Sequence, residues 1–144
     1  MNAVAELPNH AKTTGRALAA AALAAMAGAA GVAWYFDPEK VSFLPVCPLL
    51  KLTGFACPGC GLTRGFHALF HGDVVTALDF NALLPLYGLL FGYFFISLVL
   101  VVRRGRGLPI DLLRPAILWT FLGVAVVFTV LRNLPYYPFN ALYP

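Results

Sequence analysis

The sequence has few charged residues and none of the common catalytic signatures. Charged side chains make up 11% of the 144 residues, with only 6 Asp and Glu, whereas hydrophobic residues make up 60%. A soluble domain is about half apolar and about one quarter charged, so this composition excludes an ordinary soluble domain and indicates a membrane protein. The chain also has no Walker loop, Rossmann fingerprint, nucleophile elbow or His-Glu-x-x-His zinc-protease motif. These absences favour a protein that is not an enzyme.

Three stretches are long and apolar enough to cross a bilayer, whose hydrocarbon core takes about 20 helical residues. We predict the spans at residues 17–36, 80–102 and 115–131, and none of them contains Asp, Glu, Lys, Arg or His. An ion-coupled transporter or proton relay needs a titratable group within the membrane, so these spans argue against both functions. The expected fold is an all-α membrane protein with three transmembrane helices in contact with the lipid bilayer.

The first apolar stretch has a second interpretation, a cleaved signal peptide. Lys12 and Arg16 precede the stretch, and Ala27-Gly28-Ala29 has the form of a signal-peptidase site. The apolar run continues past that site to the length of a span, which favours a helix that is retained. Both interpretations export the segment that follows.

The distribution of Lys and Arg predicts the orientation, because basic residues concentrate on the cytoplasmic side. With a cytoplasmic N-terminus, segments 1–16 and 103–114 are cytoplasmic, and segments 37–79 and 132–144 are extracytoplasmic. Six of the 10 basic residues are then inside: Lys12, Arg16, Arg103, Arg104, Arg106 and Arg114. We therefore expect a multi-pass protein of the bacterial inner membrane. The net charge of +4 is explained by these residues facing anionic lipid, so a nucleic-acid partner is not implied.

The loop at residues 37–79 contains all three cysteines, as Cys47 followed by the run Cys57-Pro58-Gly59-Cys60-Gly61-Leu62-Thr63-Arg64. In one interpretation the three thiolates bind a metal ion, with His67 or His71 as the fourth ligand of a tetrahedral zinc site. Pro58 and Gly59 suit the tight turn that such a Cys-x-x-Cys knuckle needs, and Gly61 permits a positive φ after it. The sequence requires no cofactor, and zinc is the metal that this ligand set would suit.

Two other interpretations of the cysteines remain open. An extracytoplasmic loop is oxidising in many bacteria, so two of the three could form a disulfide and leave one unpaired. Alternatively, Cys57 and Cys60 have the spacing of a redox pair, with Cys60 close to the positive end of a following helix. No thioredoxin-like βαβ pattern surrounds them.

The segment after the cysteines predicts an amphipathic helix at residues 62–71 that lies in the membrane interface. Gly72 is expected to end that helix, and Asp73 to cap a short second helix that leads into the next span. Arg64 needs a counter-ion if it is buried, and Asp73 and Asp79 are the candidates.

Taken together, these motifs resemble those of a known protein family. The chain resembles a bacterial family of small membrane proteins of unknown function whose hallmark is C-P-x-C-G-x-T-R. The residues that support the resemblance, besides the cysteines and His71-Gly72, are Pro58, Gly59, Gly61, Thr63, Arg64, Asp73 and Asn81. The resemblance implies that the first apolar segment is a retained helix and that the three cysteines belong to one site.

The second span contains Gly88-x-x-x-Gly92, a pattern of small residues that lets helix backbones approach closely. It can pack the helices of this chain together, or against another membrane protein or a second copy. We therefore expect an accessory or partner-binding subunit of an envelope complex. The alternative is a thiol-redox or zinc-like metal-binding membrane protein that uses Cys47, Cys57 and Cys60.

Overall fold

The structure is a computed structural model that describes residues 9–41, 47–109 and 114–136. Within these ranges the chain forms helices and no strand, which confirms the predicted all-α class. The helices are α1 (Asn9–Tyr35), α2 (Pro48–Thr53), α3 (Leu62–Phe70), α4 (Val74–Phe80), α5 (Leu84–Arg104) and α6 (Pro115–Arg132).

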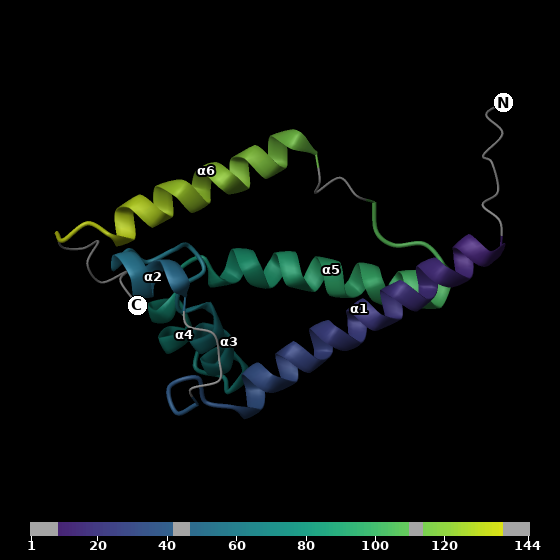
Figure 1. The fold of residues 1–144 in the computed structure, drawn as a ribbon, viewed down its shortest axis with the longest axis horizontal. Coiled ribbons are helices and arrows are strands. Elements are labelled where there is room, and N and C mark those ends of the chain that lie inside the picture. Colours follow the sequence, from purple (N-terminus) through teal and green to yellow (C-terminus); the bar gives the residue numbers. More distant parts are fainter. Residues whose placement is uncertain (1–8, 42–46, 110–113, 137–144) are drawn as a thin grey trace.

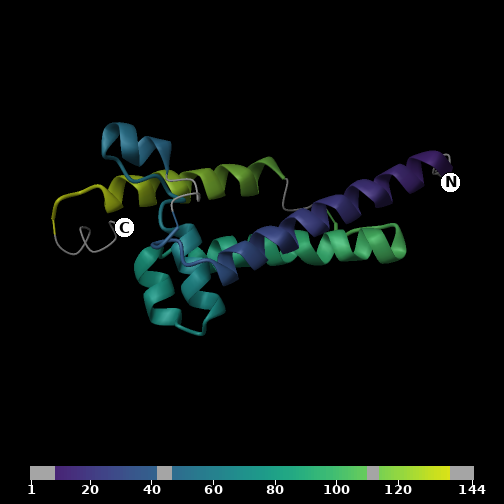
Figure 2. The same cartoon turned by 60° about the horizontal axis from the view of Figure 1, so that its bottom comes forward.

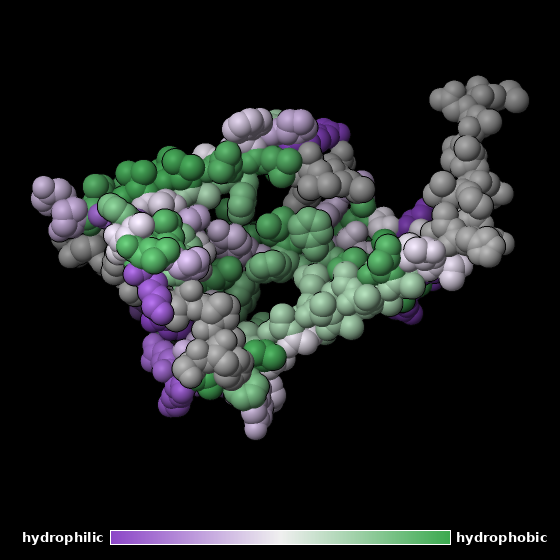
Figure 3. Space-filling view, viewed as in Figure 1, coloured by the Kyte–Doolittle hydropathy of each residue, from purple (hydrophilic) through white to green (hydrophobic). Residues whose placement is uncertain are grey.

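Three of these helices, α1 from Thr13 onward, α5 and α6, are long and apolar enough to cross a membrane. Much of their apolar surface is exposed, and Leu89 and Trp119, for example, are 74% and 70% exposed. Figure 3 shows this apolar surface along the long helices. Exposure on this scale is unfavourable in water and suits contact with lipid, so the chain has the features of a multi-pass membrane protein.

The short helices α2 to α4 gather at one end of the molecule, and α6 ends near this region while α5 begins there (Figures 1 and 2). We call this region the loop end: it comprises the C-terminal ends of α1 and α6, the N-terminal end of α5, and α2 to α4. Helix α1 packs along α5 and against α3, and α3 packs on α4. The loop end therefore combines segments from most of the chain.

Basic residues mark the opposite end, which we call the basic end. Arg103 and Arg104 finish α5, and Arg114 is the N-cap of α6. The guanidinium of Arg16 on α1 lies close to Gly105, 3.3 Å from where a Cβ on that glycine would be. The basic ends of the long helices thus lie on one side of the molecule.

The packing of α3 on α4 depends on a glycine. A Cβ on buried Gly65 would lie 3.1 Å from both the Ala77 carbonyl oxygen and Leu84 Cδ1. Such distances are tighter than ordinary contacts, so the two helices can approach this closely only without a side chain at residue 65. The connection between them follows the sequence expectation: Gly72 has φ +84°, and Asp73 Oδ1 accepts a hydrogen bond of 3.0 Å from the Thr76 N–H.

Helix α5 begins later than the span predicted at residues 80–102. Phe80 ends α4, and Asn81 is extended, with φ −159° and ψ 107°. The long helix starts only at Leu84, with Pro85 in its first turn, where a missing N–H costs nothing. Asn81 interrupts the helix because its backbone turns the chain and its side chain is almost fully buried, 1% exposed, within the loop end.

Helix α2 is not anticipated by the apolar pattern, because it has six residues and carries no buried side chain. It begins directly after Cys47, with Pro48 in its first turn. It ends at Gly54, whose φ of 76° lets its N–H reach the Leu50 carbonyl at 2.9 Å. This short helix separates Cys47 from the turn that holds the other two cysteines.

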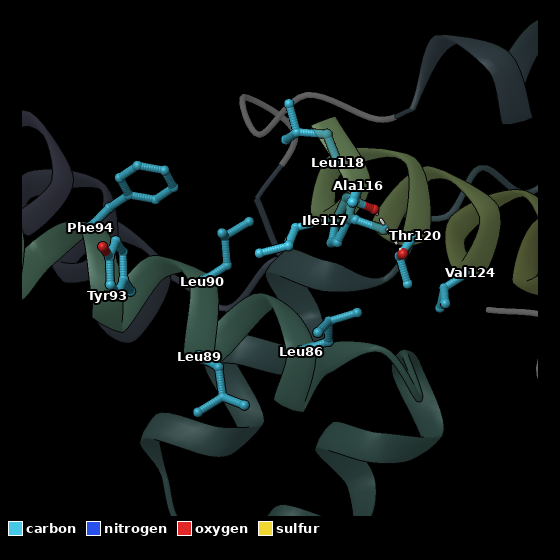
Figure 4. A pocket seen from close by; sticks show the side chains of 11 residues that line it. Leu86, Leu89, Leu90, Tyr93, Phe94, Ala116, Ile117, Leu118, Thr120 and Val124 are labelled. Atoms are coloured by element: carbon cyan, nitrogen blue, oxygen red, sulfur yellow. Dashed lines mark hydrogen bonds between the residues drawn. The ribbon is translucent and has the colours of Figure 1, made fainter. Parts of the chain in front are cut away.

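An apolar cleft of about 740 Å³ separates α5 from α6. Side chains from both helices line it, including Leu90 and Tyr93 on α5 and Ile117 on α6 (Figure 4). On α5, Gly88 and Gly92 have no described atom within 4 Å of the place a Cβ would take. The small-residue pattern therefore does not bring two described helices of this chain together.

Candidate functional site

The loop end brings the sulfur atoms of Cys47, Cys57 and Cys60 together. Cys57 Sγ lies 3.2 Å from Cys47 Sγ and 3.1 Å from Cys60 Sγ, and all three atoms are within 4.8 Å of one another. Cys60 is buried, and the other two are half-buried. Residues from two separate segments, one before α2 and one before α3, thus form a single thiol cluster.

A tight turn positions Cys57 and Cys60. The Cys60 N–H donates to the Cys57 carbonyl at 3.0 Å, and the Cys57 N–H donates to Cys60 Sγ at 3.1 Å. Gly61 follows with φ +81°, a conformation that glycine adopts without a steric penalty, and becomes the N-cap of α3. Because Pro58 and Gly59 complete the turn, both sulfur atoms face the same side.

The disulfide interpretation of this loop is wrong for the three described cysteines. A disulfide has an S–S distance of about 2.03–2.05 Å, whereas the shortest distance here is 3.1 Å and all three cysteines are free. The physical reason is the convergence itself: Cys57 lies at nearly equal distances from two sulfur atoms instead of being paired with one.

Arg132, the last residue of α6, hydrogen-bonds to the backbone of the cysteine turn. Its Nη1 donates to the carbonyl oxygens of Cys57 at 2.9 Å and Cys60 at 3.2 Å. The side chain is fully buried, and its guanidinium lies 4.9 Å from the centre of the Phe128 ring. A permanent positive charge is therefore placed next to the backbone of two of the three cysteines.

Two asparagine side chains bind the same loop. Asn81 Nδ2 donates to the carbonyls of Pro58 at 2.9 Å and Cys60 at 3.1 Å, and its Oδ1 accepts from the Leu83 N–H at 2.9 Å. Asn133 accepts from the Ala56 N–H at 2.8 Å and donates to the Ala56 carbonyl at 2.9 Å. Buried backbone groups that lack partners are costly, and these amides supply the partners.

The environments of Cys47 and Cys60 shift their pKa values in opposite directions. Hydrogen bonding to the backbone N–H of Leu50, supported by the neighbouring Cys57 thiol, lowers the pKa of Cys47 to about 7. Burial, with a further contribution from Cys57, raises the pKa of Cys60 to about 12. Without a bound cation, the cluster therefore stabilises a thiolate at Cys47 and disfavours one at Cys60.

The two candidate histidine ligands lie elsewhere, so the described cluster of ligand atoms consists of the three cysteines. His67 Nδ1 is 2.8 Å from the Ala33 carbonyl on α1, and His71 Nδ1 is 2.8 Å from the His67 carbonyl. Their rings are 4.4 Å apart, and His71 stacks on Trp34. These contacts direct both side chains toward the end of α1, and they join α3 to that helix.

Arg64 pairs with Glu39 and not with Asp73 or Asp79. Its Nη1 lies 3.8 Å from Glu39 Oε1, and its Cζ lies 5.3 Å from the Phe80 ring centre. Asp73 is used instead as the N-cap of α4. The reason is that α3 turns the face bearing Arg64 toward the segment after α1.

An open pocket of about 580 Å³ gives access to the cluster. It is lined by all three cysteines, with Glu39, Thr63 and Arg64 among the polar residues, and by Pro38, Leu50, Gly59, Gly61 and Leu62. The pocket therefore combines soft sulfur atoms with one cationic and one anionic side chain.

Sequence reasoning did not assign roles to Arg132, Asn133 or Glu39. Arg132 and Asn133 follow the third span directly, where a charge is normally taken as the membrane boundary. The only local signal was that this polar pair interrupts an otherwise apolar C-terminal region. Glu39 is one of the few acidic residues in the loop, and nothing in its spacing connects it to Arg64.

Comparison with known proteins gives one match. A family model described as a protein of unknown function, DUF2752, matches residues 47–95. This match fits the family of unknown function that the sequence resembles, and it includes all three cysteines, while the C-P-x-C-G-x-T-R hallmark stays a prediction. No curated protein and no solved structure matches the chain.

The pKa values predict selective alkylation of the metal-free, reduced protein. Cys47 should react with iodoacetamide at a rate that rises through a midpoint near pH 7, because its pKa is lowered to about 7 and the thiolate exists above it. At pH 7 we expect about threefold faster reaction than for an exposed cysteine in a peptide, since the gain in thiolate is partly offset by lower nucleophilicity. Peptide mass spectrometry after timed quenching measures each site.

In the same samples Cys60 should be about 100-fold less reactive than Cys47 at pH 7, with a difference that narrows toward pH 9, because burial raises its pKa to about 12. A common pH profile for both residues would contradict the assigned environments.

Replacement of Arg132 predicts a loosened cysteine turn. Arg132→Met keeps much of the side-chain volume but removes one charged donor from each of two carbonyls, which keep the Cys60 N–H and Asn81 Nδ2 as partners, and a hydrogen bond to a charged group is worth about 1.5–3 kcal/mol. We expect the alkylation rate of Cys60 in the metal-free protein to rise at least about tenfold and the midpoint of thermal unfolding in detergent to fall. Arg103→Met, at the exposed basic end, is the matched control and should change neither quantity. Equal Cys60 rates in both variants would contradict a role for Arg132 in holding the turn.

Proposed function

We propose that this protein is a membrane-bound metal-binding protein, in which Cys47, Cys57 and Cys60 hold one zinc-like ion as thiolates. The observation that carries the proposal is the convergence of three free sulfur atoms within 4.8 Å of one another. Zinc–sulfur bonds of about 2.3 Å in tetrahedral geometry separate the sulfur atoms by roughly 3.8 Å. The two separations from Cys57 Sγ, 3.2 and 3.1 Å, are shorter than that value by less than about 1 Å, so a metal would require only small movements of the side chains.

The donor chemistry supports a soft or borderline cation. Thiolates are the protein ligands preferred by Zn²⁺ and Cu⁺, and they bind hard cations such as Mg²⁺ and Ca²⁺ poorly. Metal binding also offsets the repulsion among three adjacent thiolates, because the cation attracts their negative charges. Bound thiols lose their protons, so formation of the site releases protons.

The charge around the cluster supports the same conclusion. A Zn²⁺ ion with three thiolates has a net charge of −1. The buried guanidinium of Arg132 donates to the carbonyls of two of the ligand residues, Cys57 and Cys60. A positive charge at this position compensates the anionic complex where water is largely excluded.

A partner-binding role is the second candidate, and one observation favours it. The Gly88 and Gly92 face of α5 has no described atom within 4 Å of a Cβ position, so it is free to pack against another membrane protein or a second copy. Such an accessory protein needs no ligand at its cysteines. The two candidate functions therefore differ in one prediction: only a metal site protects the three cysteines from alkylation when zinc is added.

Metal titration of the detergent-purified protein tests the proposal. After anaerobic reduction and removal of metal with a chelator, we expect one Zn²⁺ per chain to bind with protection of all three cysteines from alkylation. Cys57→Ser and Cys60→Ser should each weaken binding at least about 100-fold, because a hydroxyl is a poor ligand for zinc at neutral pH. His67→Gln and His71→Gln are the controls and should bind normally, since both histidines contact α1 or α3 instead.

Three cysteines that remain freely alkylated with excess zinc would overturn the metal proposal and leave the partner-binding role. Equal loss of binding in the histidine variants would place the ligands elsewhere.

We also propose that the loop end is extracytoplasmic and that the membrane is the bacterial inner membrane. Arg16 of α1 lies close to Gly105, beside Arg103 and Arg104 at the end of α5, and Arg114 is the N-cap of α6, at the end of that helix opposite to Arg132. Basic residues next to spans favour the cytoplasmic side, so this grouping supports a cytoplasmic basic end. The proposal gives the cysteine cluster an oxidising environment, in which a bound metal would protect the thiols.

Labelling of single-cysteine variants tests the orientation. A variant that retains only Cys47, with Cys57→Ser and Cys60→Ser, should react with a membrane-impermeant maleimide in intact cells after mild reduction. Arg106→Cys in a cysteine-free background is the control and should react only after lysis. The reverse pattern would overturn the orientation without affecting the metal proposal.

A further inference from the structure

The cluster offers three protein ligands, one fewer than a closed structural zinc site. Among the residues the structure describes, no His, Asp or Glu joins the three sulfur atoms. Of the segments outside the described ranges, 42–46 and 137–144 contain no Cys, His, Asp or Glu, and the acidic residues of the other two, Glu6 and Asp111, are predicted on the opposite side of the membrane. Sites with three protein ligands keep a fourth position for a small molecule.

The open side of the cluster faces the pocket of about 580 Å³. Besides the cysteines, this pocket is lined by the polar side chains of Glu39, Thr63 and Arg64. A molecule bound at the fourth position of the metal would therefore occupy a space that is bordered by Arg64.

The charge of the pocket favours an anionic group on that molecule. Arg64 is half-exposed and lies 3.8 Å from Glu39, beyond hydrogen-bond distance, and the Glu39 side chain is 61% exposed. A pair of this kind is weak, so a bound carboxylate can compete for the guanidinium and form two parallel hydrogen bonds with it. The N-terminus of α3, which lines the same pocket, adds partial positive charge.

From these observations, and resting on the proposed metal site, we propose that the ion held by Cys47, Cys57 and Cys60 is open toward the pocket and takes a small thiol that carries a carboxylate. The sulfur of this ligand occupies the fourth position, and Arg64 binds the carboxylate. The thiol proton passes to the buffer, a solvent molecule leaves the fourth position, and no electron is transferred. A soft donor is the class of ligand that suits a metal already held by three thiolates.

The test uses the full-length protein in detergent, loaded anaerobically with one Co²⁺ in place of Zn²⁺. Cobalt absorbs in the visible region with a pattern that depends on its ligands, so a fourth sulfur can be detected directly. The two probes are mercaptoacetate, which has the carboxylate, and 2-mercaptoethanol, which lacks it. We expect saturable binding of mercaptoacetate, with an increase of about one third in sulfur-to-cobalt charge-transfer absorbance as three Co–S bonds become four.

Arg64 variants test the specificity. Arg64→Gln should weaken mercaptoacetate binding about three- to tenfold and leave 2-mercaptoethanol binding unchanged, because only the carboxylate contact is lost. Compared with Arg64→Gln, Arg64→Lys should restore part of the preference for mercaptoacetate over 2-mercaptoethanol. Arg103→Gln removes the same charge at the basic end and is the matched control, with no expected effect on either probe.

The outcomes separate this inference from the metal proposal. If cobalt does not bind, both are overturned. If cobalt binds but neither thiol changes its spectrum, or if mercaptoacetate only strips cobalt from the protein, the open position is overturned and the metal site stands. A spectral change in Glu39→Gln without added thiol would identify Glu39 as the closing ligand and also overturn the inference. If Arg64→Gln weakened the binding of both thiols equally, recognition of the carboxylate by Arg64 would be excluded.

Discussion

The hydrogen bonds from Arg132 to the carbonyl oxygens of Cys57 and Cys60 are the contact on which the loop end depends. They join the final residue of α6 to a turn more than 70 positions earlier in the chain. A charged group pays a large desolvation penalty when it is buried, and hydrogen bonds of good geometry offset it. The guanidinium is permanently charged, and its Nη1 supplies the donors for both carbonyls.

The same constraint explains how an irregular loop can be buried at all. The segment from Gly54 to Gly61 lies outside the helices, and its backbone groups need partners. Asn81, before α5, and Arg132 and Asn133, at the end of α6, provide them. Residues at the ends of two membrane-spanning helices thus supply the backbone of this loop with hydrogen-bond partners, as neighbouring strands do in a sheet. Three thiols can then converge without a covalent link among them.

The sequence predicts those features of the molecule that are local. An apolar run of sufficient length defines a span, and the spacing of Cys57 and Cys60 with Gly61 defines a turn, because both depend on neighbouring residues. The predicted span starts at residue 80, earlier than α5 at Leu84, because Asn81 lies in an apolar run and its hydrogen-bond partners Pro58 and Cys60 are more than 20 residues away. The interpretation with His67 or His71 as a fourth metal ligand rests on their closeness to the cysteines in sequence. The direction in which the two histidine side chains point depends on where α1 ends, and no local sequence pattern predicts that contact.

The loop contacts have a consequence for the evolution of the sequence. Arg132, Asn133 and Asn81 all bind backbone atoms of the cysteine loop, not its side chains. Any residue except proline at position 56 presents the same N–H and carbonyl to Asn133, so such a substitution requires no compensating change at 133. These positions should therefore remain fixed individually while showing little covariation with the loop. Contact inference from correlated substitutions would miss the attachment of α6 to the cysteine turn.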